Sequence, residues 1–171
     1  INVPLKLCLS HGKSQGESQK YKLIKSNRYN ALTTVVSEPS NSSEVSGDNF
    51  TFGEGENSYF VALSDGMGTG EKADRESTIA INLLESFLEA KFDQKVALKT
   101  INSILMLKSN DELFATLDVS LLDLYTGKLQ IIKTGSPATF IKRGNEVKII
   151  NSQSLPVGIL KDVDFNVYEE Y

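Results

Sequence analysis

Cysteine and histidine are nearly absent from this chain of 171 residues, which contains one of each. A single cysteine, Cys8, excludes an internal disulfide and is typical of a protein from a reducing compartment. A single histidine, His11, cannot by itself form a zinc site or a nucleophile–base pair, so we interpret it as a surface or linker residue. The cysteine count thus excludes an internal disulfide framework, and the histidine count gives no support for a zinc site.

Long hydrophobic runs and an excess of positive charge are missing as well. No apolar run approaches the roughly 18–20 residues of a membrane span, and no signal peptide opens the chain, so we expect no membrane contact from this segment. The net charge of −4 gives no reason to expect nucleic acid, which needs a clustered positive face. With 40% hydrophobic and 23% charged residues, the composition is that of a globular domain with a substantial core.

The amino-terminal segment differs in composition from the rest of the chain. Residues 11–20 are rich in Gly, Ser, Gln and Lys, which is typical of a linker. We therefore predict that residues 1–20 are a linker or the tail of an upstream regulatory region. The remaining residues, 21–171, are expected to form one domain, which begins with β-like patterns over 22–29 and 31–36.

The hydrophobic periodicity of the domain predicts strands, then two helices, then strands. Helices are expected over 71–91 and 93–108, with Asp93 capping the second, and they should pack side by side on one sheet. Strands are expected at 49–52, 59–63, 115–125, 129–134, 138–143 and 147–150. This order favours an α+β fold with an antiparallel sheet over a Rossmann alternation.

The most informative stretch is the run 59–71, where a buried strand delivers Asp65 to its end and three glycines follow at alternate positions. Asp48 stands at the head of the preceding β-prone run, so a hairpin would bring both aspartates to one end of the sheet. Two carboxylates in one pocket need a cation between them, or one must hold a proton. The pattern therefore indicates a divalent metal site, although two acids at strand ends with no such role remain an alternative.

Residues 45–48 and 64–70 resemble the first two metal motifs of the PPM (PP2C-type) protein serine/threonine phosphatases. Within that family, the chain is most similar to the phosphatase domains of the bacterial stage II sporulation protein E branch. The similarity runs from about Asn27 to the carboxyl end, and its further motifs lie at 99–105, 116–120, 135–137, 140–144 and 155–159.

The resemblance implies a PP2C-like α-β-β-α sandwich of antiparallel sheets and two Mn²⁺ or Mg²⁺ ions that activate a water molecule. It implies that Asp65 bridges the two ions and that Asp48 helps to bind one of them, directly or through water. The carbonyl of Gly66 would ligate that same ion, and Asp48 and Asp65 would be the catalytic residues. Oxygen ligands of this kind suit both metals.

One departure from the family pattern matters. The family binds its other ion with two later aspartates, and this chain stops at Tyr171, just short of where they would begin. We interpret Asp118 as a structural hydrogen-bonding residue and Asp123 as a turn residue, and Asp164 offers no substitute. We therefore expect a domain truncated at its carboxyl end, with half of its metal centre and negligible activity.

The resemblance also implies a substrate and a location. Phosphatases of this branch act on a phosphoserine of a small anti-sigma factor antagonist, and so activate a sporulation sigma factor. The expected location is cytoplasmic, as a domain of a membrane-anchored parent protein. Whether the domain forms a homodimer is left open by the sequence. The alternative function is a non-catalytic PPM-fold module that binds a partner.

Overall fold

The computed structural model describes residues 4–9, 21–38, 45–68, 70–107, 114–161, 163 and 165–171. His11 and Asp164 lie outside these described residues. The main sheet has five antiparallel strands in the order β3-β4-β5-β6-β9. Their bounds are Asp48–Glu54, Ser58–Asp65, Leu117–Asp123, Leu129–Thr134 and Asn166–Glu170.

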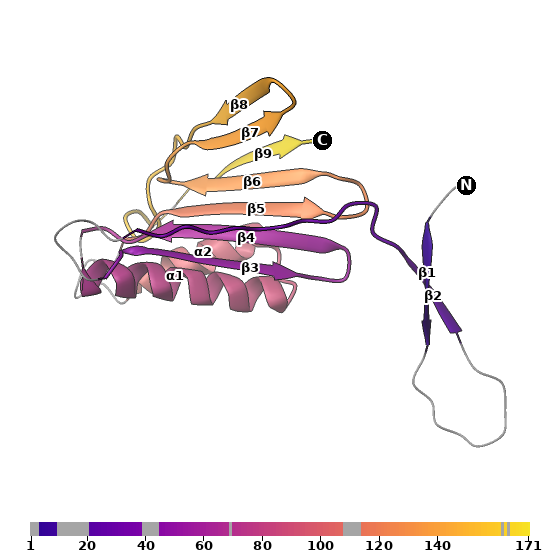
Figure 1. The fold of residues 1–171 in the computed structure, drawn as a ribbon. Helices are drawn as coiled ribbons and strands as arrows, with labels where there is room; N and C mark the ends of the chain where they lie inside the picture. The colour runs from indigo at the N-terminus through magenta and orange to yellow at the C-terminus, as the bar shows by residue number, and fades with distance from the viewer. Residues whose placement is uncertain are drawn as a thin grey trace, which may run out of the picture.

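Two helices cover one face of this sheet, α1 at Glu71–Glu89 and α2 at Gln94–Leu107 (Figure 1). Alternate strand residues point toward them, because successive side chains of a strand face opposite sides. The resulting core is built from both layers, with Ala62, Leu117, Val119 and Ile132 from the sheet and Ile81, Leu84, Leu98, Ile101 and Leu105 from the helices. The predicted α+β fold with an antiparallel sheet is confirmed, as is the packing of both helices on one sheet.

The link between the helices has the hydrogen bonds that commonly end a helix. Lys91 donates its N–H to the carbonyl of Leu88, and Phe92 donates to Phe87, both at 3.0 Å. Lys91 adopts a left-handed conformation with φ of 58°, and the rings of Phe87 and Phe92 meet edge to face at 5.3 Å. This is a Schellman motif with its hydrophobic contact.

The residue predicted to cap the second helix, Asp93, directly precedes it and caps it. Asp93 Oδ1 accepts the backbone N–H groups of Lys95 and Val96 at 3.0 and 3.1 Å. The cap satisfies two of the N–H groups that the first turn of α2 leaves unpaired.

Two hairpins and an extended segment complete the described structure outside the main sheet and its helices (Figure 1). The two separate hairpins lie outside this sheet (Figure 1). β1, Leu5–Leu9, pairs with β2, Tyr21–Lys25, past the ends of its strands, and β7, Thr139–Arg143, pairs with β8, Glu146–Ile150, beyond its β9 edge. An extended segment, residues 26–38, runs from β2 along the sheet. It is tied to the sheet by the hydroxyl of Tyr59, which donates to Thr33 Oγ1 at 2.8 Å.

Three details differ from the sequence predictions. Residues 31–36 are extended as predicted but form no ladder with a described strand, so the β-like pattern gives no sheet strand there. The edge strand β9 was not predicted. The third detail is that β1, which was not predicted as a strand, pairs with β2 across residue 20, while the assignment of residues 1–20 to a linker or tail of an upstream region stays a prediction. Neither described helix is long and apolar enough to cross a membrane.

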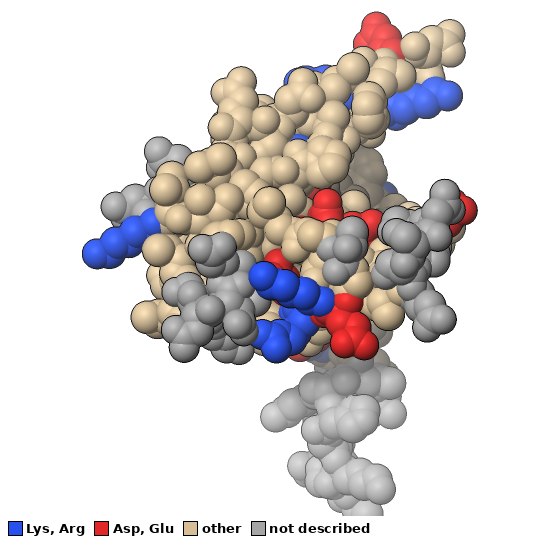
Figure 2. Space-filling model, turned by 90° about the vertical axis from the view of Figure 1, so that its left-hand side faces the viewer, with Lys and Arg blue, Asp and Glu red and all other residues tan. Residues whose placement is uncertain are grey.

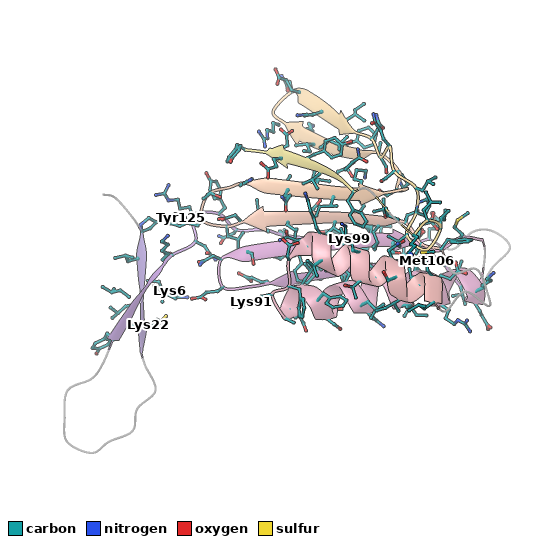
Figure 3. The ribbon with its side chains drawn as sticks, turned by 180° about the vertical axis from the view of Figure 1, so that it is seen from behind. Lys6, Lys22, Lys91, Lys99, Met106 and Tyr125 are labelled. Atoms are coloured by element: carbon teal, nitrogen blue, oxygen red, sulfur yellow. The ribbon has the colours of Figure 1, made fainter. Side chains whose placement is uncertain are left out.

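The left-handed conformation of Lys91 generates a stability prediction. Lys91→Gly should stabilise the protein by about 0.5–1 kcal/mol, because glycine adopts this conformation without a steric cost. Lys99→Gly is the matched control: it also replaces an exposed lysine of the helical face, but within α2 (Figure 3). It should destabilise by about 1 kcal/mol. Urea unfolding measures both, and destabilisation by Lys91→Gly would contradict the prediction.

Candidate metal centre

The two aspartates singled out by the sequence face each other directly. In the register of β3 and β4, Asp48 lies opposite Asp65. Their neighbours Asn49 and Ser64 occupy the alternate positions, and Asn49 Nδ2 donates to Asp74 and Ser77 of α1, at 2.9 Å in each case. Both aspartates therefore point away from the helices, at the end of the sheet where β4 finishes.

Two cavities meet at this pair of carboxylates. The larger, of about 360 Å³, lies on the sheet face opposite the helices and includes Asp48, Asp65, Thr116, Asp118 and Ser136 in its lining. The smaller, of about 220 Å³, is lined by the loops that precede β3 and follow β4. Figure 2 views the molecule from this end and shows acidic side chains near the middle of the face, with basic side chains beside them.

The environment of Asp65 disfavours its negative charge. Burial raises the pKa of Asp65 above its ordinary value, and the charge of Asp48 and a hydrogen bond to that carboxyl raise it further. The neighbouring hydroxyl of Thr116 accepts the backbone N–H of Asp65 at 2.9 Å, so the main chain of the residue is fixed. A cation between the two carboxylates would relieve this repulsion.

The backbone at Gly66 packs so tightly on α1 that no other residue fits. A Cβ at Gly66 would lie 1.9 Å from the carbonyl oxygen of Ala73, and one at Gly47 would lie 2.8 Å from the Cβ of Ala73. Gly66 donates its N–H to the carbonyl of Gly47 at 3.1 Å, and the hydroxyl of Ser77 donates to that same carbonyl at 2.6 Å. The backbone flanking both aspartates is therefore clamped to the first turns of α1.

A buried glutamate, which sequence reasoning did not single out for this role, holds the next part of the loop. Glu76 of α1 is fully buried, and its carboxylate accepts the backbone N–H groups of Met67, at 3.2 Å, and Phe114. Burial raises the pKa of Glu76, whereas the charge of Lys72 and these hydrogen bonds lower it. In the sequence, Glu76 was only one of several acids near the helix start, and no local pattern marks it as buried.

Just before β5, the backbone at Ala115 is joined to two other segments by isolated β-bridges. Gly66 pairs with Ala115, and Ala115 pairs with Val157. The buried amide of Asn102 in α2 holds this last segment, because its Oδ1 accepts the N–H of Gly158 at 2.8 Å and its Nδ2 donates to the carbonyl of Leu160 at 2.9 Å. Both helices therefore contribute to the position of Gly66.

The remaining acids behave as the sequence predicted, with one addition. Asp123 is a turn residue whose Oδ1 accepts the N–H groups of Tyr125 and Thr126, both at 2.8 Å, and these hydrogen bonds lower its pKa. Asp118 is a structural hydrogen-bonding residue, which accepts hydrogen bonds from Thr139 and from the fully buried ammonium group of Lys133. The addition is that Asp118 also lines the cavity beside Asp65.

The site offers oxygen donors only, from two carboxylates and the backbone around Gly66. Among the residues that the structure describes, no group of three or more His, Cys, Asp or Glu side chains converges to hold a metal ion. The donor chemistry fits Mg²⁺ or Mn²⁺, which prefer oxygen ligands. The roles of Asp48, Asp65 and Gly66 as ligands stay a prediction.

The opposed aspartates generate a prediction about stability in the absence of metal. Asp48→Asn should stabilise the metal-free protein at neutral pH by roughly 0.2–1 kcal/mol, the range for directly opposed side chains in a sheet. The pKa of Asp65 is raised in the folded state, so its unfavourable charge is present at high pH and absent below its ordinary value of 3.8. The stability gained by Asp48→Asn should therefore vanish in acid. Thermal unfolding of both proteins between pH 3 and 8 measures this difference.

Asp123→Asn is the matched control for this experiment. Hydrogen bonds lower the pKa of Asp123, so its charge stabilises the folded state, opposite to the charge of Asp65. This stabilisation is present at neutral pH and is lost as the pH falls. Asp123→Asn should therefore lower the melting temperature at neutral pH. If Asp48→Asn and Asp123→Asn shifted the melting temperature in the same direction at pH 7, the electrostatic account of the pair would be wrong.

The contact between Gly66 and α1 generates a second prediction. Gly66→Ala should destabilise the protein by about 1–3 kcal/mol or more, because the added Cβ meets backbone rather than a flexible side chain. Gly144→Ala is the control, since a Cβ there meets nothing within 4 Å and only its φ of 58° opposes the change. Chemical denaturation should show the larger loss for Gly66→Ala, and equal losses would argue against the clamp.

Comparison with known proteins identifies the family. A family model described as stage II sporulation protein E (SpoIIE) matches residues 55–171. Stage II sporulation protein E of Bacillus subtilis is 46% identical over 127 residues, which cover 74% of this chain and 15% of that protein. The protein of the same name from Priestia megaterium is 42% identical over 127 residues, which cover 74% of this chain and 22% of that protein.

Solved structures agree with this assignment. The PP2C phosphatase domain of SpoIIE from Bacillus subtilis, with a fragment of its regulatory domain, superposes with a TM-score of 0.82 at 37% identity, covering 98% of this chain and 50% of that one. RsbX in complex with magnesium matches with a TM-score of 0.60 at 17% identity, covering 75% and 62%, which shows the fold alone. The chain spans about half of the first structure and 15–22% of the curated relatives. The predicted PP2C-like fold class is thus confirmed, and the chain belongs to the stage II sporulation protein E (SpoIIE) family.

Proposed function

We propose that this chain is part of a metal-dependent protein serine/threonine phosphatase domain. The observation that carries the proposal is the direct opposition of Asp48 and Asp65 at a cavity, with a raised pKa at Asp65, in a chain of the SpoIIE family. Two acids held together against their repulsion are typical of a cation site.

The residues have distinct parts in this proposal. Asp48 and Asp65 line both cavities. In this proposal Asp65 would be the carboxylate shared by both ions, while Asp48 and the carbonyl of Gly66 would serve one of them. When bound, Mn²⁺ or Mg²⁺ supplies the charge that activates water and neutralises the phosphoryl oxygens. The chain's own contribution is to hold both carboxylates and the Gly66 backbone in fixed positions through α1.

The proposed substrate is a phosphoserine of a small anti-sigma factor antagonist, and the proposed outcome is activation of a sporulation sigma factor. Membership of the SpoIIE family supports both, because the resemblance implies them. We further propose a cytoplasmic location within a membrane-anchored parent protein. Since the metal pair recognises little beyond phosphate, selectivity between phosphoproteins must come from the surrounding surface.

The activity of residues 1–171 follows from charge. Asp48 and Asp65 supply two negative charges, whereas two divalent ions carry four positive ones. Without further carboxylates, the second ion would rest mainly on Asp65 and water, and a single ion cannot both polarise the phosphate and hold the attacking water in line. We therefore propose that this segment by itself binds at most one ion and has negligible turnover.

The proposal is tested by phosphate release from a phosphoserine protein. The full-length protein should hydrolyse it only with Mn²⁺ or Mg²⁺, and Asp65→Ala should abolish turnover. Asp123→Ala, which removes an acid that lines neither cavity at the aspartate pair, should retain it. Residues 1–171 alone should be inactive and bind at most one Mn²⁺ in a calorimetric titration. Robust manganese-dependent hydrolysis by residues 1–171 would overturn these roles. Metal-independent partner binding by an inactive full-length protein would favour the alternative, a non-catalytic PPM-fold module.

A further inference from the structure

The larger cavity beside Asp48 and Asp65 is lined by a serine whose hydroxyl has no hydrogen-bond partner among the described residues. Ser136 follows β6 and lines this cavity together with both aspartates. Its side chain is 7% exposed, and among the described residues its Oγ has no partner. A buried hydroxyl without a partner costs free energy, so it points to a ligand that would supply one.

The position of Ser136 is fixed by the packing of its loop. Gly135 has φ of 60°, and a Cβ there would lie 2.5 Å from Cγ of Pro156. The N–H of Gly135 donates to the carbonyl of Ser154 at 2.9 Å, and the hydroxyl of Ser154 donates to the carbonyl of Lys133 at 2.8 Å. The hydroxyl of Ser136 is thus not needed to hold its own loop.

Several other donors around the cavity already have acceptors, and the hydroxyl of Thr116 is engaged as the acceptor of the Asp65 N–H. The ammonium group of Lys133 donates to Asp118 and Thr139, and the hydroxyl of Thr139 donates to Asp118. The amide of Asn49 donates to residues of α1. Since these donors are committed, they are not available to a ligand in the cavity.

A second unpartnered hydroxyl nearby has a different environment. Ser64 also lacks a partner among the described residues, but it shares a face of β4 with Ala62, which is part of the core under the helices. Ser37, at the rim, is exposed and can bond to water. Ser136 is therefore the buried hydroxyl best placed to serve a ligand beside the aspartates.

The charge of the cavity indicates what that ligand needs. Its charged lining residues are acids: Glu38, Asp48, Asp65 and Asp118. Carboxylates repel a phosphoryl group, whose oxygens act as acceptors, so a phosphoryl group bound here needs donors as well as cations. A hydroxyl in the cavity wall can supply one such donor.

We propose that Ser136 is a substrate-binding residue whose hydroxyl donates a hydrogen bond to a phosphoryl oxygen of the substrate. The inference rests on the proposed phosphatase function and deepens it. The bond is made to substrate, transition state and product phosphate alike, so it lowers KM and the inhibition constant of phosphate without changing kcat.

The test is Ser136→Ala in the full-length protein, assayed with Mn²⁺ and a phosphoserine protein. KM and the inhibition constant of inorganic phosphate should each rise roughly ten-fold, while kcat stays within about two-fold. The Mn²⁺ concentration for half-maximal activity should not change. Calorimetric titration of inorganic phosphate, with Mn²⁺ present, should show the same loss of affinity and does not depend on turnover.

Two further variants separate binding from structure. Ser136→Thr keeps the hydroxyl and should restore the phosphate inhibition constant toward the wild-type value. Ser103→Ala removes an exposed hydroxyl of α2 that is not part of the cavity lining, so it should leave phosphate affinity unchanged. An unchanged inhibition constant and calorimetric affinity in Ser136→Ala would overturn the inference. An inactive wild-type protein would instead contradict the proposed phosphatase function, and the calorimetric comparison would still test Ser136.

Discussion

The opposition of Asp48 and Asp65 across β3 and β4 is the constraint on which this end of the molecule depends. Two like charges at directly paired positions destabilise a sheet, and partial burial together with the charge of Asp48 raises the pKa of Asp65. The fold retains this unfavourable pair because the hairpin is held from behind by α1, through Gly47, Gly66 and Ser77. Strain of this kind is typical of functional sites, where stability is given up for a defined arrangement of charges.

The backbone around Gly66 is positioned by contacts from distant parts of the sequence. Glu76 of α1 holds the N–H of Met67, and Asn102 of α2 holds the segment that bridges to Ala115 and so to Gly66. Glu76 and Asn102 are both buried and both hydrogen-bond to backbone groups, so we expect a change in the packing of the helices to shift the loop. The helical layer is therefore part of the site, although both aspartates point away from it.

Much of this arrangement could be predicted from the sequence, because it is encoded in local patterns. The hairpin of Asp48 and Asp65, the two helices, the cap at Asp93 and the turn at Asp123 all follow from periodicity and residue type. The burial of Glu76 could not be predicted, since it depends on which loop packs against one face of α1. The edge strand β9 is five residues long and, among the described strands, pairs with β6 alone, so its sequence pattern is weak.

In the proposed function, the negative charges of the larger cavity make the binding of phosphate and the binding of cations depend on each other. Its acids face inward, and the buried ammonium group of Lys133 is directed at Asp118 rather than at the open cavity. A phosphate group therefore meets a negative wall until cations neutralise it. Because cations strengthen phosphate binding by this mechanism, phosphate must strengthen cation binding by the same factor. A site with two aspartates and few free donors thus has little affinity for phosphate by itself, and in the proposed function its binding of phosphoryl groups depends on the bound metal.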